Sequence, residues 1–188
     1  NTFLFVGGGL NEKAAIWRVS NSQSAQKVSN DGVDKAIQSF TDDEIAGAFA
    51  ATFTIGGQFI ATFTFESIVV DPVTFCYNAT SQKWFQLQTG AKSGRWRVNS
   101  IGTAYNRVIC GDSQGGTIGS VEVDTDTEYN QPIIRTVSLQ PIADLGHAIA
   151  ITQLEVTMNS GSGDLNVKNP SIRLRTSKDA HIFNNSLT

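Results

Sequence analysis

In the stretch Gln58-Phe-Ile-Ala-Thr-Phe-Thr-Phe-Glu66, every second residue from Phe59 on is phenylalanine or alanine. In an extended chain, successive side chains point to opposite faces, so three phenylalanines and one alanine share a face. A period of two predicts a half-buried β-strand. Residues 48–55 are equally rich in β-branched and aromatic side chains, and Gly56-Gly57 between the two stretches predicts a hairpin turn. The residues of the apolar face are Phe59, Ala61, Phe63 and Phe65.

The same alternation recurs along most of the chain and predicts an all-β, mainly antiparallel fold. Further strands are expected at residues 3–6, 16–19, 74–78, 84–88, 107–110, 117–123, 133–139, 148–158 and 171–176.

One short helix is expected among these strands. Val33, Ala36, Ile37 and Phe40 share a helical face, and Asp31 is the expected cap. The acidic run at residues 42–44 is expected to follow this helix as a solvated loop. A single helical segment is therefore predicted in a chain that otherwise consists of strands and loops.

Composition excludes several classes of protein. The 188 residues carry a net charge of −3, which argues against a strongly basic nucleic-acid binder. No apolar run approaches the roughly 18 residues of a membrane-spanning helix. The only methionine is Met158, so Asn1 is not a translation start, and we expect a fragment of a longer protein. Cys76 and Cys110 are expected to be buried free thiols on strands rather than a disulfide.

Weak internal repeats organise the strands. Residues 3–19 and 107–121 both read as a strand, a glycine-rich turn and a second strand. Such repeats predict partial β-propeller-like blades, too few to close a ring. After Pro141 the glycine and aromatic rhythm stops. We therefore expect incomplete blades over residues 1–140 and a smaller β-rich subdomain over residues 141–188.

A serine hydrolase motif is present but lacks its context. Gly111-Asp-Ser113-Gln-Gly115 matches the pattern of a nucleophile elbow, and Asp144 and His147 follow in the order of α/β-hydrolases. That elbow needs a helix after the serine, whereas residues 117–123 read as a strand. A hairpin turn is the favoured interpretation, and no enzyme activity is predicted.

Metal and cofactor sites also lack support. Asp124, Asp126 and Glu128 begin like a calcium loop, but the sixth and twelfth positions hold Tyr129 and Arg135. The two histidines and two cysteines show no paired zinc-ligand spacing. No phosphate-binding glycine loop stands between a strand and a helix. The prediction is therefore that no cofactor or metal is bound.

Four arginines are the candidate contacts with other subunits or partners. Arg95 and Arg97 flank Trp96, with both guanidinium groups expected on one strand face. The favoured interpretation makes Trp96 a core residue and the two arginines solvated or locally paired. Arg173 and Arg175 alternate with apolar residues on a later strand and are expected to face outward.

From Val33 onward the order of features resembles the packaged-DNA stabilisation proteins of short-tailed phages related to P22, which form the tail hub. The resemblance is to part of the later half of such a protein. The stretches that carry it are residues 33–37, 57–65, 75–80, 94–97, 108–112, 127–133 and 172–179.

This resemblance implies a structural virion protein with a β-propeller-like body, present as a ring of identical copies. It implies docking to portal and adaptor proteins, contact with the tail needle and retention of packaged DNA. It further implies assembly in the host bacterial cytoplasm, followed by residence in the phage tail. Neither sequence-specific nucleic-acid binding nor membrane association is expected.

A second function class stays open from the residues alone. A ligand-binding β-propeller of a cell-surface or secreted protein would bind a carbohydrate or a peptide. Such sites usually gather aromatic side chains on loops, whereas Trp17, Trp84 and Trp96 lie in expected strands. This pattern favours core roles for the tryptophans.

Overall fold

The computed structural model describes residues 2–9, 12–20, 24–90, 94–142, 149–157, 172–178 and 182–184. It divides into two units, Asn1–Ile134 and Arg135–Thr188, and all of its named strands and helices lie in the first. The predicted domains, residues 1–140 and 141–188, stay a prediction.

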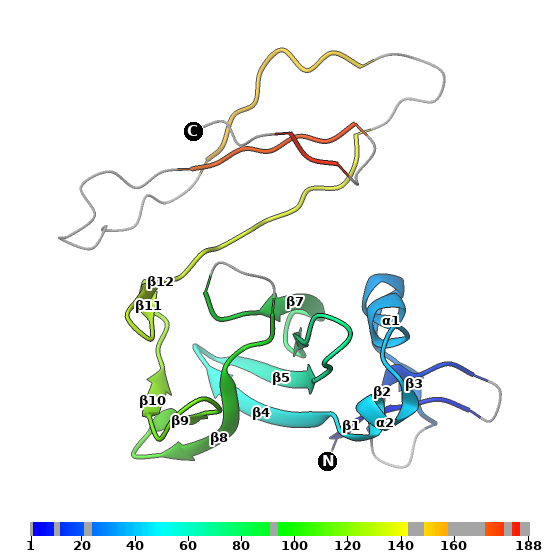
Figure 1. Cartoon of the computed structure of the whole chain (residues 1–188), viewed down its shortest axis with the longest axis vertical. Helices are drawn as coiled ribbons and strands as arrows, with labels where there is room; N and C mark the ends of the chain where they lie inside the picture. Colours follow the sequence, from blue (N-terminus) through cyan, green and yellow to red (C-terminus); the bar gives the residue numbers. More distant parts are fainter. Residues whose placement is uncertain are drawn as a thin grey trace. The chain divides into compact units, whose positions relative to one another are not determined.

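A four-stranded sheet forms the centre of the first unit (Figure 1). Its strands pair in chain order and antiparallel, and Gly56 and Gly57 form the first turn with positive φ angles of 55° and 74°. Glycine suits that turn because it carries no Cβ to clash. The predicted hairpin is thus confirmed. The strands are β4 (Phe49–Ile55), β5 (Gln58–Phe65), β6 (Val73–Asn78) and β7 (Lys83–Leu87).

Smaller sheets complete the described part of the first unit. All their strand pairs are antiparallel, which confirms the mainly antiparallel class, and none of the described sheets closes on itself. One contains β1 (Thr2–Gly7), β2 (Ala15–Ser20) and β3 (Gln26–Lys27). Another contains β8 (Val98–Ala104), β9 (Arg107–Asp112) and β10 (Ile118–Val121), and a hairpin pairs β11 (Thr127–Glu128) with β12 (Gln131–Pro132).

Two short helices, rather than the single predicted one, connect β3 to β4. The first, α1 (Asp31–Ile37), is capped by the Asn30 side chain, which accepts a hydrogen bond from the Val33 N–H, and not by Asp31. The acidic run begins α2 (Asp42–Ala46) instead of a loop.

Local capping explains the second helix. Thr41 and Glu44 exchange hydrogen bonds in a capping box, which satisfies N–H groups of the first turn. Carboxylates are also favourable at the positive amino end of a helix. Residues 42–44 directly follow Thr41, so their carboxylates lie in the first turn of a helix instead of in a solvated loop.

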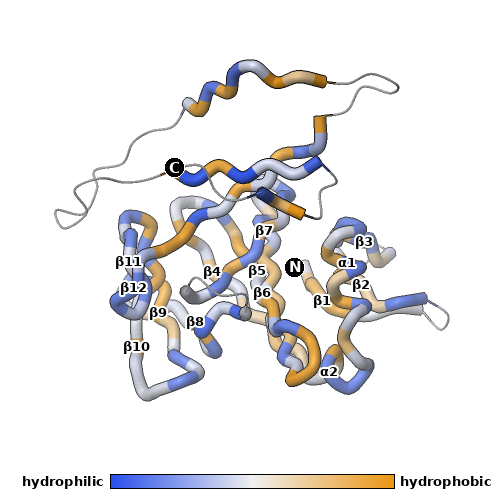
Figure 2. Tube along the Cα trace, turned by 45° about the horizontal axis from the view of Figure 1, so that its top comes forward, coloured by the Kyte–Doolittle hydropathy of each residue, from blue (hydrophilic) through white to orange (hydrophobic). Residues whose placement is uncertain are grey.

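Two hydrophobic cores cover opposite faces of the central sheet, and hydrophobic stretches run along β5 and β6 in Figure 2. Phe63 and Phe65 of β5 belong to the first core, with residues of α1 and β2. Ile60 belongs to the second core, with residues of β8 and β9. The prediction of a half-buried strand was therefore wrong, because a neighbouring layer lies on each face of the sheet.

Several other strands differ between the prediction and the structure. Residues 95–97 precede β8 instead of forming a strand, and β8 was missed because it is rich in small polar residues. Residues 133–139 and 149–157 contain no strand, and residues 172–178 contain only isolated bridge positions. Alternating side chains permit a strand, but the backbone forms one only when a neighbouring chain supplies hydrogen bonds.

Candidate functional site

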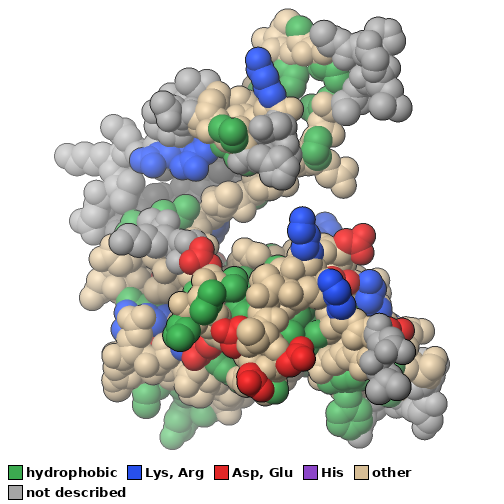
Figure 3. Space-filling view, turned by 45° about the vertical axis from the view of Figure 1, so that its right-hand side comes forward, with side chains coloured by type: hydrophobic (Ala, Val, Ile, Leu, Met, Phe, Trp, Pro, Cys, Tyr) green, Lys and Arg blue, Asp and Glu red, His purple; other side chains and the backbone are tan. Residues whose placement is uncertain are grey.

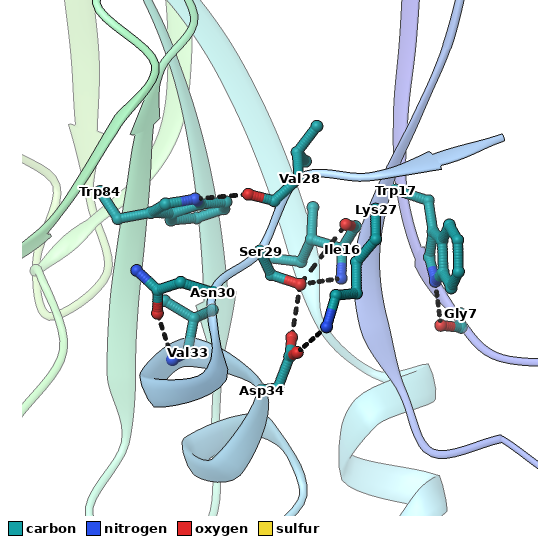
Figure 4. A network of polar contacts seen from close by, with 10 residues as sticks. All are labelled: Gly7, Ile16, Trp17, Lys27, Val28, Ser29, Asn30, Val33, Asp34 and Trp84. Atoms are coloured by element: carbon teal, nitrogen blue, oxygen red, sulfur yellow. Dashed lines mark hydrogen bonds and ion pairs between the residues drawn. The ribbon is translucent and has the colours of Figure 1, made fainter.

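The sheet of β1–β3, which we call the first sheet, packs against the central sheet at a contact that we call the first joint. Trp84 of β7 lies in this joint. Its indole N–H donates a hydrogen bond to the carbonyl of Val28, at 2.9 Å, across 56 residues of chain (Figure 4). The Trp84 ring lies 4.9 Å from that of Tyr77 and 6.2 Å from that of Phe63, measured between centroids. Tryptophan combines a large apolar surface with one hydrogen-bond donor, so Trp84 both packs between the two sheets and bonds from one to the other.

A buried polar network ties α1 to the first sheet at the same joint (Figure 4). Ser29 accepts a hydrogen bond from the N–H of Ile16 at 3.0 Å and donates one to the Asp34 carboxylate. Lys27 pairs with the other oxygen of Asp34 at 2.9 Å, and this partner raises the pKa of the lysine. A buried carboxylate needs such partners, so the network fixes the position of α1.

The central sheet also packs against the sheet of β8–β10, at a contact that we call the second joint. Trp96 is buried in the core of this joint. Its backbone N–H donates to the hydroxyl of Thr74 on β6 at 3.1 Å, and its indole N–H donates to Glu128 at 2.6 Å. Thr74 and Thr64 also share a hydrogen bond, at 3.0 Å. The segment before β8 is thus anchored to the central sheet.

Arg97 closes the rim of this second joint. It contacts Asp112 through two nitrogens, with Nε–Oδ1 and Nη2–Oδ2 distances of 2.7 and 2.5 Å. Its guanidinium lies 4.0 Å from the centroid of the Tyr129 ring, which adds a cation–π contact. The arginine lowers the pKa of Asp112, and Asp112 raises the pKa of Arg97.

The other candidate arginines differ in their surroundings. Arg95 pairs with Glu66 at 2.7 Å and lies 5.7 Å from the centroid of the Phe49 ring. Arg173 and Arg175 are exposed in the second unit. Arg95 and Arg97 are therefore paired within the chain, whereas contact of any of the four arginines with another subunit stays a prediction.

Sequence reasoning missed the polar partners in these joints: Ser29, Asp34, Thr74, Asp112 and Glu128. The sequence drew attention to two of them for other reasons: Asp112 lies inside the serine motif, and Glu128 lies in the suspected calcium loop. Ser113 sits between the antiparallel strands β9 and β10, so the predicted hairpin is confirmed. Its N–H donates to the carbonyl of Arg97 at 3.0 Å. The proposed triad partners, Asp144 and His147, lie outside the described residues.

Both cysteines are free and buried in the second core, as the sequence predicted. Burial raises the pKa of both thiols, which disfavours the reactive thiolate. Within the described ranges, no group of three or more His, Cys, Asp and Glu residues could hold a metal ion. Glu128, a member of the suspected calcium loop, instead accepts the Trp96 hydrogen bond.

Two further observations concern the charge of the surface and the possibility of a membrane-spanning helix. On the face shown in Figure 3, acidic side chains lie among hydrophobic and uncharged ones over the first unit. None of the helices in the described segments is long and apolar enough to cross a membrane.

Comparison with known proteins identifies the family. Residues 1–126 match the Phage_stabilise family, described as Bacteriophage P22 Gp10, beta-propeller. No curated protein matches the chain. The matched range contains β1 to β10, and of the joint residues described above only Glu128 and Tyr129 lie beyond it. The chain therefore belongs to the Phage_stabilise family of structural phage proteins, whose fold is a β-propeller.

Proposed function

We propose that this protein belongs to a phage tail hub that closes the portal channel after genome packaging and retains the packaged DNA. The observation that carries the proposal is the family match over residues 1–126. The structural role in a phage follows from the family, whereas the position in the tail and the partners are our inference.

The construction of the first unit suits a wall that withstands pressure. Two hydrophobic cores lie on opposite faces of one sheet. The indole N–H of Trp84 and the backbone N–H of Trp96 each bond across one of the two joints. Close-packed interiors have low compressibility, so such a stack resists deformation. The net charge of −3 avoids a strong electrostatic grip on DNA that must later leave.

The proposed assembly is a ring of identical copies below portal and adaptor proteins, with the tail needle bound on the other side. Arg173 and Arg175 are the proposed contacts to a neighbouring subunit, because both are exposed and no described carboxylate pairs with them. Assembly would occur in the cytoplasm of the host bacterium, and the assembled hub would remain in the virion.

Sedimentation of the full-length protein, alone and with purified portal rings, tests this function. We expect a portal-bound ring, and we expect Arg173→Glu combined with Arg175→Glu to prevent ring assembly. Lys178→Glu reverses a charge on the same exposed segment and serves as the matched control. A stable monomer that ignores portal rings would refute the tail-hub role, whereas normal rings from the double variant would refute only the arginine contacts.

The second function class, a carbohydrate- or peptide-binding propeller, gains no support from the tryptophans. Trp17, Trp84 and Trp96 all donate their indole N–H to acceptors within the chain. A sugar-binding platform would instead present such rings on exposed loops.

A further inference from the structure

Two hairpin turns of the chain share a sequence pattern and a backbone geometry. Thr103-Ala-Tyr105-Asn106 leads through the turn between β8 and β9, and Thr127-Glu-Tyr129-Asn130 leads through the turn between β11 and β12. In both turns the tyrosine and the asparagine are left-handed, with φ angles of 52° and 58° in the first and 46° and 62° in the second. Asparagine tolerates this region, but a bulky tyrosine enters it only with backbone strain. That strain is the cost of placing a tyrosine at the tip of each hairpin.

The two tyrosines differ in what covers their rings. The guanidinium of Arg97 lies 4.0 Å from the centroid of the Tyr129 ring, and Asp112 pairs with the same guanidinium. Tyr105 is 94% exposed, so no described side chain covers its ring. The β11–β12 turn therefore shows which group suits a tyrosine in this geometry: a guanidinium held beside a carboxylate.

A carboxylate also lies at the end of the sheet that carries Tyr105. Val121, the last residue of β10, pairs with Val108 near the start of β9, so the chain leaves the sheet at the end where the Tyr105 turn lies. The next residue is Glu122, whose carboxylate accepts a hydrogen bond from the Ser120 hydroxyl at 2.8 Å.

The surroundings of this tyrosine are acidic overall. Residues 118–132 contain four carboxylates and no lysine or arginine. Two of the carboxylates, Glu122 and Asp124, are exposed and form no ion pair with a described residue. Arg107 is the only basic residue in β8, β9 and β10. We call the surface made of Tyr105, Glu122 and Asp124 the acidic tip.

Residues 172–178, which we call the basic segment, have the complementary chemistry. They contain Arg173, Arg175 and Lys178 and no carboxylate. In an extended chain the two arginines lie on the same side, about 7 Å apart along the backbone. Both are exposed, and neither pairs with a described carboxylate.

From these observations we infer that the acidic tip of one copy of the chain binds the basic segment of a second copy. One arginine of the segment lies over the Tyr105 ring, as Arg97 lies over Tyr129, and the other pairs with a carboxylate of the tip. This inference rests on the proposed contacts of Arg173 and Arg175 between subunits, and it names the surface that receives them.

The contact joins two different surfaces, and every copy carries both of them. Such a head-to-tail contact produces a closed ring when the rotation between neighbours closes, which suits the proposed assembly. A planar guanidinium stacks on an aromatic ring better than a compact, strongly hydrated ammonium does. The arginines rather than Lys178 therefore make the contact.

Sedimentation velocity of the full-length protein measures this contact through self-association. Tyr105→Ala removes the ring, and Tyr105→Phe is the matched control because phenylalanine keeps the aromatic face and loses only the hydroxyl. The position is 94% exposed, and both replacements have the same left-handed backbone, so the melting temperatures of the two variants should agree. We expect Tyr105→Ala to weaken self-association about tenfold and Tyr105→Phe to weaken it less than about twofold.

A mixture of two variants tests whether the contact joins separate copies. Tyr105→Ala keeps an intact basic segment, and a variant with both Arg173→Glu and Arg175→Glu keeps an intact acidic tip. We expect each variant alone to stay monomeric at a concentration where the unmodified protein forms rings. Their mixture should form dimers and nothing larger, because only one contact of each dimer is intact.

Several results would overturn this inference. They are unchanged self-association of Tyr105→Ala, an equal loss in Tyr105→Phe, and a mixture of the two variants that stays monomeric. An unmodified protein that is monomeric but still binds portal rings would overturn this inference and leave the tail-hub role intact. Rings that need Tyr105 but ignore portal rings would instead count against the tail-hub role and support the contact.

Discussion

The two faces of the central sheet are covered in different ways. The first face packs large aromatic rings against α1, with the Phe65 ring 5.5 Å from Phe40 and 6.4 Å from Phe75 between centroids. The second face packs Phe53 and Trp96 with aliphatic side chains and two cysteines, and Arg97 and Asp112 pair at its rim. The central sheet thus contacts the first sheet and α1 through packed aromatic rings. It contacts the β8–β10 sheet through a smaller core with an ion pair at its rim.

This difference indicates that the three packed sheets are not held together by the same contact repeated at each joint. Each joint contains an indole N–H that bonds to another part of the chain, but the acceptor is a backbone carbonyl in one case and a carboxylate in the other. We expect the second joint to weaken in acid, because the ion pair at its rim needs the ionised carboxylate of Asp112.

The largest expected effect comes from Phe65→Ala in the aromatic joint. Phe65 is fully buried, so its truncation leaves a cavity and should lower the free energy of unfolding by about 3–5 kcal/mol. Phe59→Ala on the same strand is the control, because Phe59 is 41% exposed, and should cost within about 1 kcal/mol. Urea denaturation measures both, and equal losses would contradict the assignment of this core.

Ile60→Ala tests whether the second face is buried as well. Ile60 is 5% exposed and packs in the second core, so we expect a loss of about 2–4 kcal/mol in the same urea experiment. A half-buried strand would instead tolerate this change within about 0.5 kcal/mol, which would restore the simpler expectation from the sequence.

Trp84→Phe tests the hydrogen bond between the first two sheets. The change keeps most of the ring but leaves the Val28 carbonyl without its donor, and should cost about 1–2 kcal/mol. Trp17→Phe removes a comparable bond to the Gly7 carbonyl within one hairpin. Hydrogen exchange distinguishes the two variants: only Trp84→Phe should speed exchange in both sheets. Identical exchange patterns would argue against a specific link between the sheets.

The smallest expected effect is the acid response of the second joint. Arg97 lowers the pKa of Asp112 in the folded state, so the ion pair stabilises the protein above the unfolded pKa of about 3.9. That contribution is lost as pH falls through the lowered folded pKa. Asp112→Asn should therefore lower the melting temperature at neutral pH, and the difference from the unmodified protein should shrink in acid.

Asp124→Asn is the control for this measurement, because Asp124 is exposed in the segment after β10. Its melting temperature should follow that of the unmodified protein at each pH. If the Asp112→Asn difference stays constant from neutral pH to pH 3, the ion pair is not the source of the acid response.

Much of the fold could be predicted because its signals are local. Alternating side chains, the Gly56-Gly57 turn and the strand after Ser113 each involve only a few consecutive residues. The same reasoning failed for β8, whose small polar residues lack a strong pattern, and for α2, whose start depends on the capping box formed by Thr41 and Glu44. The candidate site was harder, since Arg97 and Asp112 are 15 residues apart.

The sequence by itself determined the antiparallel β class, the central hairpin and the burial of both cysteines. A period of two fixes which side chains share a face, because it follows from backbone geometry alone. Only the tertiary structure decided that both faces of β5 are covered and that Arg97 binds Asp112. These features depend on contacts between distant segments, and the local pattern of a strand does not specify which segment will cover it.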